Sequence, residues 1–503
     1  MELDTGSIKR TELALKLDPN DRRPLYVQIA DQLVEAIESE QLRTGDRLPA
    51  MRDLATQLDC ALVTVSQAYD LLSARGRVTS RVGKGTFVAD THEETAPFAR
   101  RWEPDVGRFA RAERMEGVLE QLTRATAPGA ITLATGHPAP ETFPLQDFGR
   151  AMHRTLLDDP PESMQYRSSS GDRDLCQTLA GLLQSRGCKA SASDIVVCSG
   201  AQQAADLVAN VLLEHRSVVA SESPTYAGTL GVFDARGVTY VEVQSDADGV
   251  RVDDVERVFS EYRPRLFYLN PIAQNPTGAV LPQRRAKQIV ALARRYDVVI
   301  LEDQTGWQFT YDATAPPPLA AFDTDGRVIL MESLSKSIFP ALRIGYLYGK
   351  GGIADALELA KVRADVFTST LTQRALWRFV NAPAYARHVR SARALYRQRR
   401  DAFMEALAEA VPWSDLRAPA AGVNVWLALP SRISTQAAFD ECAREGVLVM
   451  PSEPMYPTRT GPPAIRLSFG HLSVEEAREG VSRLGRALAR IAPQPQVAAS
   501  GSP

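Results

Sequence analysis

The chain has 503 residues, 44% of them hydrophobic and 24% charged, which is typical of a soluble globular protein with two or three domains. The formal net charge of −3 excludes a general attraction to nucleic acid, so any DNA contact requires a local basic surface. The five cysteines form no CxxC pair, which argues against a disulfide framework and against a metal site. We find no secretion signal and no apolar stretch of bilayer length, and expect a cytoplasmic protein without a membrane partner.

The first compact pattern, which we place in a domain of residues 1–88, predicts a winged helix-turn-helix. Its first helix begins behind Pro24 and has an apolar residue every four positions, at Leu25, Ile29, Leu33 and Ile37. Helices are then expected from Met51 to Leu58 and from Leu62 to Ala74. Residues 77–88 alternate like two strands that turn at Gly83-Lys84-Gly85. The third helix of such a unit is suited to the major groove of DNA.

Polar and basic side chains of this unit are the candidate DNA contacts. The face of the third helix opposite its apolar positions carries Thr64, Ser66 and Gln67. The hairpin region contributes a cluster of bases without an acid, formed by Arg75, Arg77, Arg81 and Lys84. Taken alone, such a hairpin is more simply explained as a solvated charged surface. Because this hairpin follows three predicted helices, the basic cluster favours binding to a double-stranded DNA operator.

The remainder of the chain predicts a linker, a large α/β domain and a tail. Residues 89–129 have little periodicity and predict the linker, with one weakly amphipathic helix near residues 115–122. Within residues 130–491, helical stretches such as 283–295 separate short apolar runs, which is typical of a mostly parallel sheet that a small α/β subdomain completes. The expected strands are 195–198, 217–220, 240–243, 266–270, 298–301 and 328–331. Residues 492–503 are rich in Pro, Ala and Ser and predict a disordered tail.

One segment of the large domain carries a chemical signature. Lys336 follows Ser333-Leu334-Ser335, and Arg343 comes seven residues later. The lysine amine can form an imine with an aldehyde, while the hydroxyls and the guanidinium can hold a dianion. Pyridoxal 5′-phosphate is the cofactor that carries both groups.

Four other segments add to this site, although each has a plainer explanation. Cys198 to Gln203 places a glycine turn between a strand and a helix, where backbone N–H groups can hold a phosphate, but such turns are common. Tyr226 can stack on a pyridine ring or simply pack in the core. Asn275 can donate to a ring oxygen or belong to a β-turn. Asp303 ends a buried strand and can pair with a pyridine nitrogen, or it can cap a helix.

Together and in this order, the segments reveal a family resemblance. Residues from about Ile131 to Ile491 resemble the fold-type I aminotransferases, and Pro24–Val88 resembles the GntR-type winged helix. The combination resembles the MocR-type bacterial transcriptional regulators. That resemblance implies a fold-type I α/β domain, mostly parallel with a small subdomain, behind a winged helix-turn-helix.

The resemblance also assigns roles to individual residues. It implies that Lys336 carries the cofactor as an internal aldimine, that Asp303 pairs with the pyridinium, that Asn275 bonds the ring oxygen and that Tyr226 stacks on the ring. It assigns the phosphate to Ala201, Gln202, Ser333, Ser335 and Arg343. Tyr166 matches a tyrosine that reaches the phosphate of a neighbouring subunit, which implies a homodimer. Arg466 matches the arginine that grips a substrate carboxylate.

The chain departs from the family pattern in three places. Thr305 stands where relatives usually carry a tyrosine that donates to the ring oxygen, so we expect altered cofactor electronics unless a neighbour substitutes. In the DNA module, Ala61-Leu62 replaces the common Ser-Arg pair, and Ala50 replaces a serine. Arg52 and Thr64 are retained and keep backbone contact plausible, but sequence preference cannot be transferred from relatives.

Three functional hypotheses follow from these motifs. The first is a transcription factor in which pyridoxal phosphate, with an amino acid or amine effector, modulates operator binding. The second is a working aminotransferase with an accessory DNA module, and the sequence leaves open whether catalysis goes beyond weak half-reactions. The third is a sensor of the free cofactor, for which Arg466 would be dispensable.

Overall fold

The computed structural model describes residues 13, 15–18, 21, 23–39, 41–74, 76–81, 85–89, 114, 129–166 and 168–491, without the side chains of residues 74 and 81. The chain divides into two compact units, Met1–Arg111 and Ala112–Pro503. The amphipathic stretch expected near residues 115–122 and the expected tail lie outside the described residues. None of the described helices is both long and apolar enough to cross a membrane.

The first unit is a winged helix. It contains the helices α1 (Leu25–Glu38), α2 (Met51–Gln57) and α3 (Leu62–Ala74), followed by the antiparallel strands β1 (Val78–Arg81) and β2 (Gly85–Val88). One face of each helix packs into a single core around Ile29, Leu33, Leu54, Val65 and Leu72. The expected helices and hairpin are therefore confirmed. The segment before α2 also pairs with β2, through the N–H of Leu48, which donates to Thr86 O at 2.9 Å.

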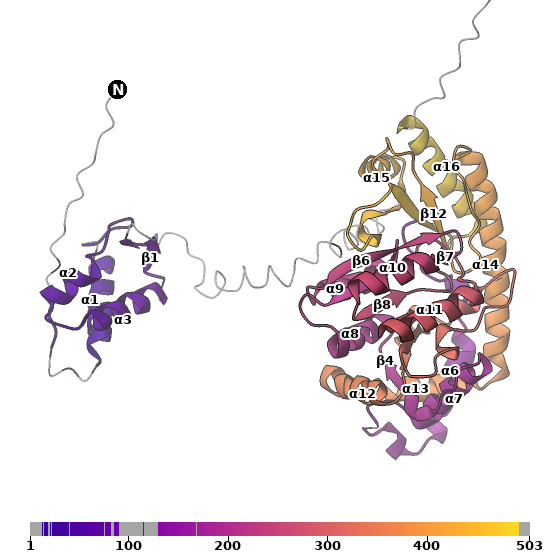
Figure 1. The fold of residues 1–503 in the computed structure, drawn as a ribbon, viewed down its shortest axis with the longest axis horizontal. Helices are drawn as coiled ribbons and strands as arrows, with labels where there is room; N and C mark the ends of the chain where they lie inside the picture. Colours follow the sequence, from indigo (N-terminus) through magenta and orange to yellow (C-terminus); the bar gives the residue numbers. More distant parts are fainter. Residues whose placement is uncertain are drawn as a thin grey trace, which may run out of the picture. The chain divides into compact units, whose positions relative to one another are not determined.

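An eight-stranded sheet forms the centre of the second unit (Figure 1). Its strand order is β4-β11-β10-β9-β8-β5-β6-β7, and only β11 and β7 run antiparallel to their neighbours. The strands are β4 (Ile195–Cys198), β5 (Val218–Ser223), β6 (Thr239–Asp246), β7 (Gly249–Val250), β8 (Leu266–Leu269), β9 (Val299–Asp303), β10 (Val328–Ser333) and β11 (Gly345–Tyr348). The mostly parallel sheet expected from the sequence is confirmed. The sequence did not single out β11, which lies between β4 and β10.

Helices cover both faces of this sheet because successive residues of its strands point to opposite sides. Ile300 and Leu330 face the core beneath α7, α10, α11 and α13, whereas Leu301 and Ile329 face the core beneath α8, α9 and α12. The helices are α6 (Leu145–Asp158), α7 (Arg173–Ser185), α8 (Ala201–Leu212), α9 (Ala227–Asp234), α10 (Val252–Tyr262), α11 (Gln283–Tyr296), α12 (Gly352–Asp365) and α13 (Thr370–Val380).

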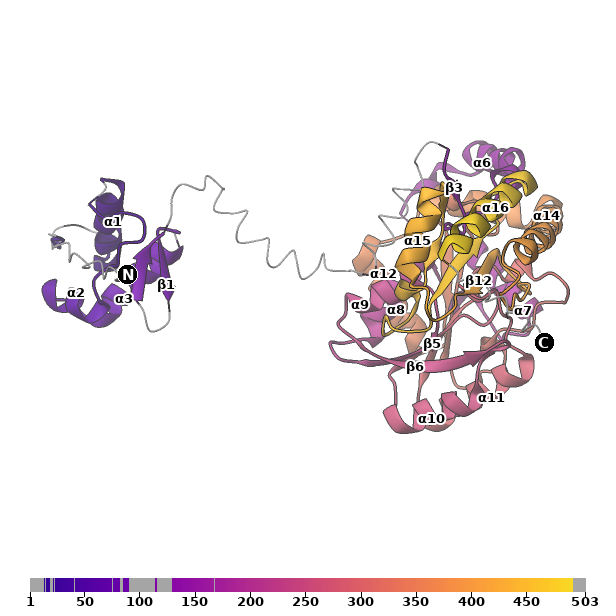
Figure 2. The ribbon, with the colours of Figure 1, turned by 90° about the horizontal axis from the view of Figure 1, so that it is seen from above.

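A smaller subdomain completes the unit (Figure 2). Its three-stranded antiparallel sheet has the order β12 (Asn424–Ala428), β15 (Ala464–Ser468) and β14 (Met450–Pro451), and β13 (Val447–Leu448) pairs in parallel with β3 (Ile131–Thr132). The helices α15 (Thr435–Arg444) and α16 (Val474–Ile491) pack beside this sheet. The long helix α14 (Pro383–Ala410) runs along the side of the unit in Figure 1 and packs on both α16 and α13.

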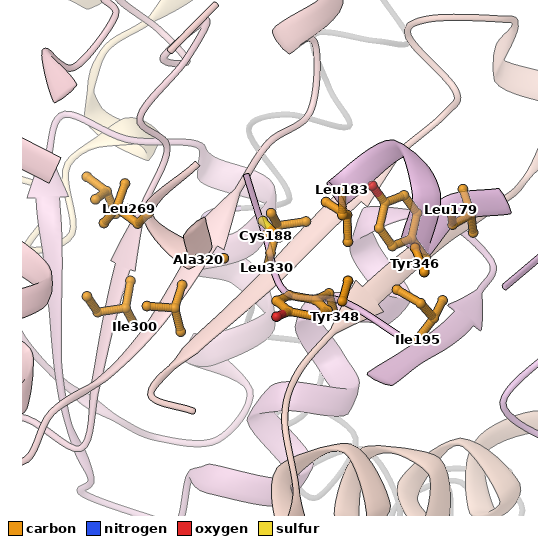
Figure 3. Close-up of a cluster of buried hydrophobic side chains, with 14 of the residues drawn as sticks. Leu179, Leu183, Cys188, Ile195, Leu269, Ile300, Ala320, Leu330, Tyr346 and Tyr348 are labelled. Atoms are coloured by element: carbon orange, nitrogen blue, oxygen red, sulfur yellow. The ribbon is translucent and has the colours of Figure 1, made fainter. Parts of the chain in front are cut away.

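The larger core holds the strands that carry the chemical motifs in place. Figure 3 shows Tyr346 and Tyr348 of β11 among Leu183 and Ile195, with Ile300 of β9 at the other end of the cluster. Ile300 has no solvent exposure and lies three residues before Asp303 on the same strand. The position of Asp303 therefore depends on this packing.

We expect Ile300→Ala to lower the free energy of unfolding by about 2–5 kcal/mol, because it removes buried methyl groups and leaves a cavity. Ile300→Val removes one methylene and should cost about 0.5–1.5 kcal/mol. Urea denaturation followed by tryptophan fluorescence measures both. Equal losses for the two variants would contradict close packing at this position.

Candidate functional site

A cavity of about 420 Å³ opens where the parallel strands end and the smaller subdomain begins. It brings together ten of the side chains predicted from the sequence: Ala201, Gln202, Tyr226, Asn275, Asp303, Ser333, Ser335, Lys336, Arg343 and Arg466. They come from segments that span more than half of the chain. The roles expected of them are therefore geometrically compatible with a single ligand site.

Lys336 lines this cavity, where burial makes its ammonium form less stable than it is in water. Its Nζ donates to the backbone oxygen of Gly136 at 2.7 Å and contacts no carboxylate of the described residues. Burial, assisted by the positive charge of Arg466, lowers the pKa of Lys336 to about 8. A buried amine with this pKa has a substantial neutral fraction near pH 7–8 and is a competent nucleophile toward an aldehyde.

Asp303 lies at the carboxyl end of β9. Its carboxylate accepts hydrogen bonds from the N–H of Thr305 at 2.9 Å and from the hydroxyl of Tyr268 at 3.1 Å. Burial raises the pKa of Asp303 above its usual value, and these hydrogen bonds only partly oppose the rise. No cation of the described residues forms an ion pair with it. A protonated ring nitrogen placed here would supply the missing positive charge.

An anion cradle lies at the amino end of α8. Gly200 has φ 98°, and a Cβ at this position would lie 3.1 Å from Arg343 Nη2, so the guanidinium lies directly against the turn. Arg343 donates to Ser199 O at 2.7 Å. The Oγ of Ser335 is buried and has no hydrogen-bond partner among the described residues. Free helix N–H groups, an unsatisfied hydroxyl and a guanidinium together fit a phosphate dianion.

Arg466 reaches the cavity from β15 of the smaller subdomain. Its Nη2 donates to Ala134 O and its Nη1 donates to Asn275 Oδ1 at 3.3 Å, while its Nε is buried without a partner. Burial lowers the pKa of Arg466 to about 10, and no carboxylate of the described residues pairs with it. Asn275 accepts through its side-chain oxygen, so its amide N–H groups face the cavity without a described acceptor.

Thr305 places a hydroxyl where relatives carry a tyrosine. Its Oγ1 is buried without a hydrogen-bond partner and lines the cavity. The donor whose loss the sequence predicted is therefore retained, on a shorter side chain.

Tyr226 lies at the start of α9 with its ring packed over Gly228, where a Cβ would lie 2.5 Å from the ring.

Sequence reasoning missed several residues that line the cavity. His137 and Gly136 come from the segment after β3, and Asn424, whose Oδ1 is buried without a partner, comes from β12. None of them belongs to a recognisable motif, so only the fold could place them. Burial, together with the charges of Lys336 and Arg466, lowers the pKa of His137.

Tyr166 does not lie in this cavity. It is 80% exposed, and its ring packs edge-on against Phe367 with centroids 5.3 Å apart. Its expected reach into the site of a second subunit stays a prediction.

The candidate DNA contacts are placed differently from one another. Arg52 and Gln67 are exposed, whereas Thr64 and Ser66 are half-buried on α3. Arg77 forms an ion pair with Glu38 of α1 at 2.8 Å. Lys84 and the side chain of Arg81 lie outside the described residues. The structure adds Arg47, which is exposed and lies so close to β2 that a Cβ on Gly85 would be 2.6 Å from its Nε.

Comparisons with known proteins agree with both units. Residues 128–484 match the family of class I and II aminotransferases, and residues 25–88 match the bacterial regulatory proteins of the gntR family. The chain is 30% identical to the HTH-type transcriptional regulator TauR of Rhodobacter capsulatus, over 94% of this chain and 98% of TauR. It is 28% identical to a Rhizobium meliloti protein that is named as a rhizopine catabolism regulatory protein, MocR. This match covers 76% of this chain and 77% of that one.

The fold has counterparts among solved structures. A kynurenine aminotransferase of Pyrococcus horikoshii, solved in complex with pyridoxamine phosphate (PMP), superposes with a TM-score of 0.72 at 30% identity, covering 75% of this chain and 95% of that one. The cofactor of this type of domain is pyridoxal 5′-phosphate, and the anion cradle, Asp303 and the buried amine of Lys336 fit it. With a gntR-family unit ahead of a class I and II aminotransferase domain, the chain belongs to the MocR-type transcriptional regulators.

Proposed function

We propose that ligands in the cavity of the aminotransferase domain control the affinity of the winged helix for double-stranded operator DNA. The observation that carries this proposal is Arg466, a buried guanidinium without a carboxylate partner among the described residues, in the same cavity as Lys336. A site built for the cofactor alone has no need of this cation. The energetic cost of burying Arg466 favours a ligand that brings a carboxylate.

Each side chain of the site has a proposed role. Bound pyridoxal phosphate supplies an aldehyde that condenses with primary amines and a ring that withdraws electrons. Lys336 would hold the cofactor through Nζ, and Asp303 would keep a proton at the ring nitrogen. Asn275 and Thr305 would donate to the ring oxygen, and Tyr226 would pack on the ring. The phosphate would be held by Ala201, Gln202, Ser333, Ser335 and Arg343, which line the cavity.

The lining of the cavity limits the class of effector. Its cationic side chains in the described part of the chain are Lys336 and Arg343, which serve the cofactor, and Arg466, which serves one carboxylate. The remaining wall is largely apolar and includes Phe309, Tyr396, Val423, Met450 and Met455. We therefore propose an amino acid with an uncharged side chain, because a second carboxylate would be desolvated there without a cation.

Two further points belong to this proposal. We propose a homodimer in which Tyr166 contributes to the partner's site, and its exposed ring beside Phe367 supports that role. The alternative function, an active aminotransferase, is supported by the hydroxyl of Thr305, which leaves a donor at the position where the family resemblance predicts a tyrosine. Sustained turnover of an amino donor with a keto acid at ordinary enzyme rates would favour that alternative.

The pKa of Lys336 predicts how cofactor capture depends on pH. Only the neutral amine attacks the aldehyde, so the capture rate should rise with pH and level off above about 8. Arg466→Met removes a positive charge that lowers this pKa, and the midpoint should move upward. Stopped-flow absorbance measures the rate, and Lys336→Ala supplies the blank. A midpoint near 10 in the unmodified protein would contradict the proposed environment of the amine.

The effector proposal predicts a response in DNA affinity. With a duplex selected by the protein from a random library, alanine or methionine in the presence of cofactor should change the dissociation constant by about 5-fold or more, within the usual range of allosteric coupling. Aspartate and glutamate should act much more weakly. Arg466→Gln should abolish the amino acid response and keep the cofactor absorbance, whereas Arg417→Gln, on an exposed arginine, should respond normally. A normal response in Arg466→Gln refutes the role of the carboxylate.

The first turn of α3 predicts how the operator is read. Leu62 and Val63 are 45% and 62% exposed, and the first turn of a recognition helix commonly contacts base edges. Apolar side chains there recognise thymine methyl groups. Replacing a contacted thymine with deoxyuridine should weaken binding about 4-fold, the equivalent of burying one methyl group. Fluorescence anisotropy measures this loss, which Leu62→Ala should reduce. Uniform tolerance of deoxyuridine across the site would overturn this mode of recognition.

A further inference from the structure

Arg114 is the one residue between positions 90 and 128 that the structure describes, and it is only 3% exposed. Its Nε donates to Asp234 Oδ2 at 2.7 Å, and its Nη1 donates to Pro454 O at 2.6 Å and to Tyr456 O at 2.8 Å. Its Nη2 donates to Pro457 O at 2.9 Å. We call Asp234 and these three carbonyls the arginine socket.

The socket is specific for a guanidinium. A carboxylate on one side and three carbonyls on the other match the forked donors of arginine, which lysine cannot reproduce. Asp234 is itself held by the hydroxyl of Tyr240, which donates to its Oδ1 at 2.9 Å. In the sequence, Arg114 lies in the segment that joins the DNA-binding unit to the aminotransferase domain, so the socket fixes one point of that segment on the domain.

The two sides of the socket belong to different parts of the domain. Asp234 is the last residue of α9, the helix that begins behind Tyr226. The carbonyls of Pro454 and Tyr456 flank Met455, which follows β14 of the smaller subdomain and lines the cavity. The Met455 carbonyl accepts from the N–H of Thr225 at 2.8 Å. Beside the ligand cavity, Arg114 therefore connects the part of the domain built on the eight-stranded sheet with the smaller subdomain.

A short chain of contacts connects the socket with the carboxylate site. Met455 packs with Ala134 and with Ala227, the first residue of α9. The carbonyl of Ala134 accepts from Arg466, the guanidinium proposed to hold the effector. A carboxylate bound at Arg466 would compete with this contact, and Ala134 belongs to the same buried cluster as Met455 of the segment that carries the socket carbonyls.

We propose that the arginine socket is an intramolecular docking site for the linker, and that an effector carboxylate at Arg466 stabilises the docked state. The coupling rests on the proposed function, whereas the docking itself does not. Because coupling between two sites is reciprocal, a docked Arg114 also raises the affinity for the effector. The linker is thereby the element through which the cavity acts on the DNA-binding unit.

Trypsin tests the docking without DNA or cofactor, because its specificity pocket must take up the arginine side chain. Brief digestion of the full chain should produce fragments that begin at Ala112, after Arg111, much faster than fragments that begin at Met115. Arg114→Lys keeps a trypsin site, and Asp234→Asn keeps the size of the socket, yet both should speed cleavage after residue 114. Arg295→Lys, at an exposed ion pair on α11, is the matched control. Rapid cleavage after Arg114 in the unmodified chain refutes the docking.

The coupling is tested separately in the holoprotein. Alanine or methionine should slow cleavage after Arg114, and Arg114→Ala should weaken effector binding by about 5-fold or more while cofactor absorbance is retained. The same variant should lose the effector response of DNA affinity. If the unmodified protein shows no effector response, the proposed function fails. If it responds and Arg114→Ala responds equally, only the coupling through the socket fails.

Discussion

Lys336 and Arg466 are buried in one cavity without a carboxylate partner among the described residues, and most of the site's properties follow from this uncompensated burial. Burial lowers the pKa of both groups, and the positive charge of Arg466 lowers that of Lys336 further. The protein supplies carbonyl oxygens from Gly136 and Ala134 as hydrogen-bond acceptors, and these lack the negative charge that would neutralise the pair. Ligands that bring anionic groups would offset the cost of burying these two cations.

The cations of the cavity come from two different parts of the aminotransferase domain. Lys336 and Arg343 follow β10 of the eight-stranded sheet, whereas Arg466 lies on β15 of the smaller subdomain. A ligand held by both groups therefore links the two parts of the domain. Arg114 contacts the same two parts of the domain from outside the cavity, through Asp234 on one side and Pro454 O on the other. A change in the relative position of these two parts is therefore a physical basis for a regulatory signal.

Much of the fold and many of the residues that line the cavity could be predicted from the sequence, because they lie in ordered motifs at strand ends. Lys336, Asp303 and Asn275 were recognisable since each follows an apolar run. Residues without a motif, such as His137 and Asn424, could not be placed, because short strands far apart in the chain bring them to the cavity. Arg114 was equally hidden, since most of its partners are backbone carbonyls that any sequence possesses.

The ion pair between Arg77 and Glu38 has a consequence for the electrostatics of operator binding. Arg77 donates to Glu38 through Nη2 at 2.8 Å, so a carboxylate of the protein offsets part of the positive charge that a DNA phosphate would meet there. Counterion release governs how steeply salt weakens protein–DNA binding. Because Glu38 neutralises part of the charge at Arg77, the number of basic side chains on the winged helix sets an upper limit for the salt dependence expected of its DNA binding.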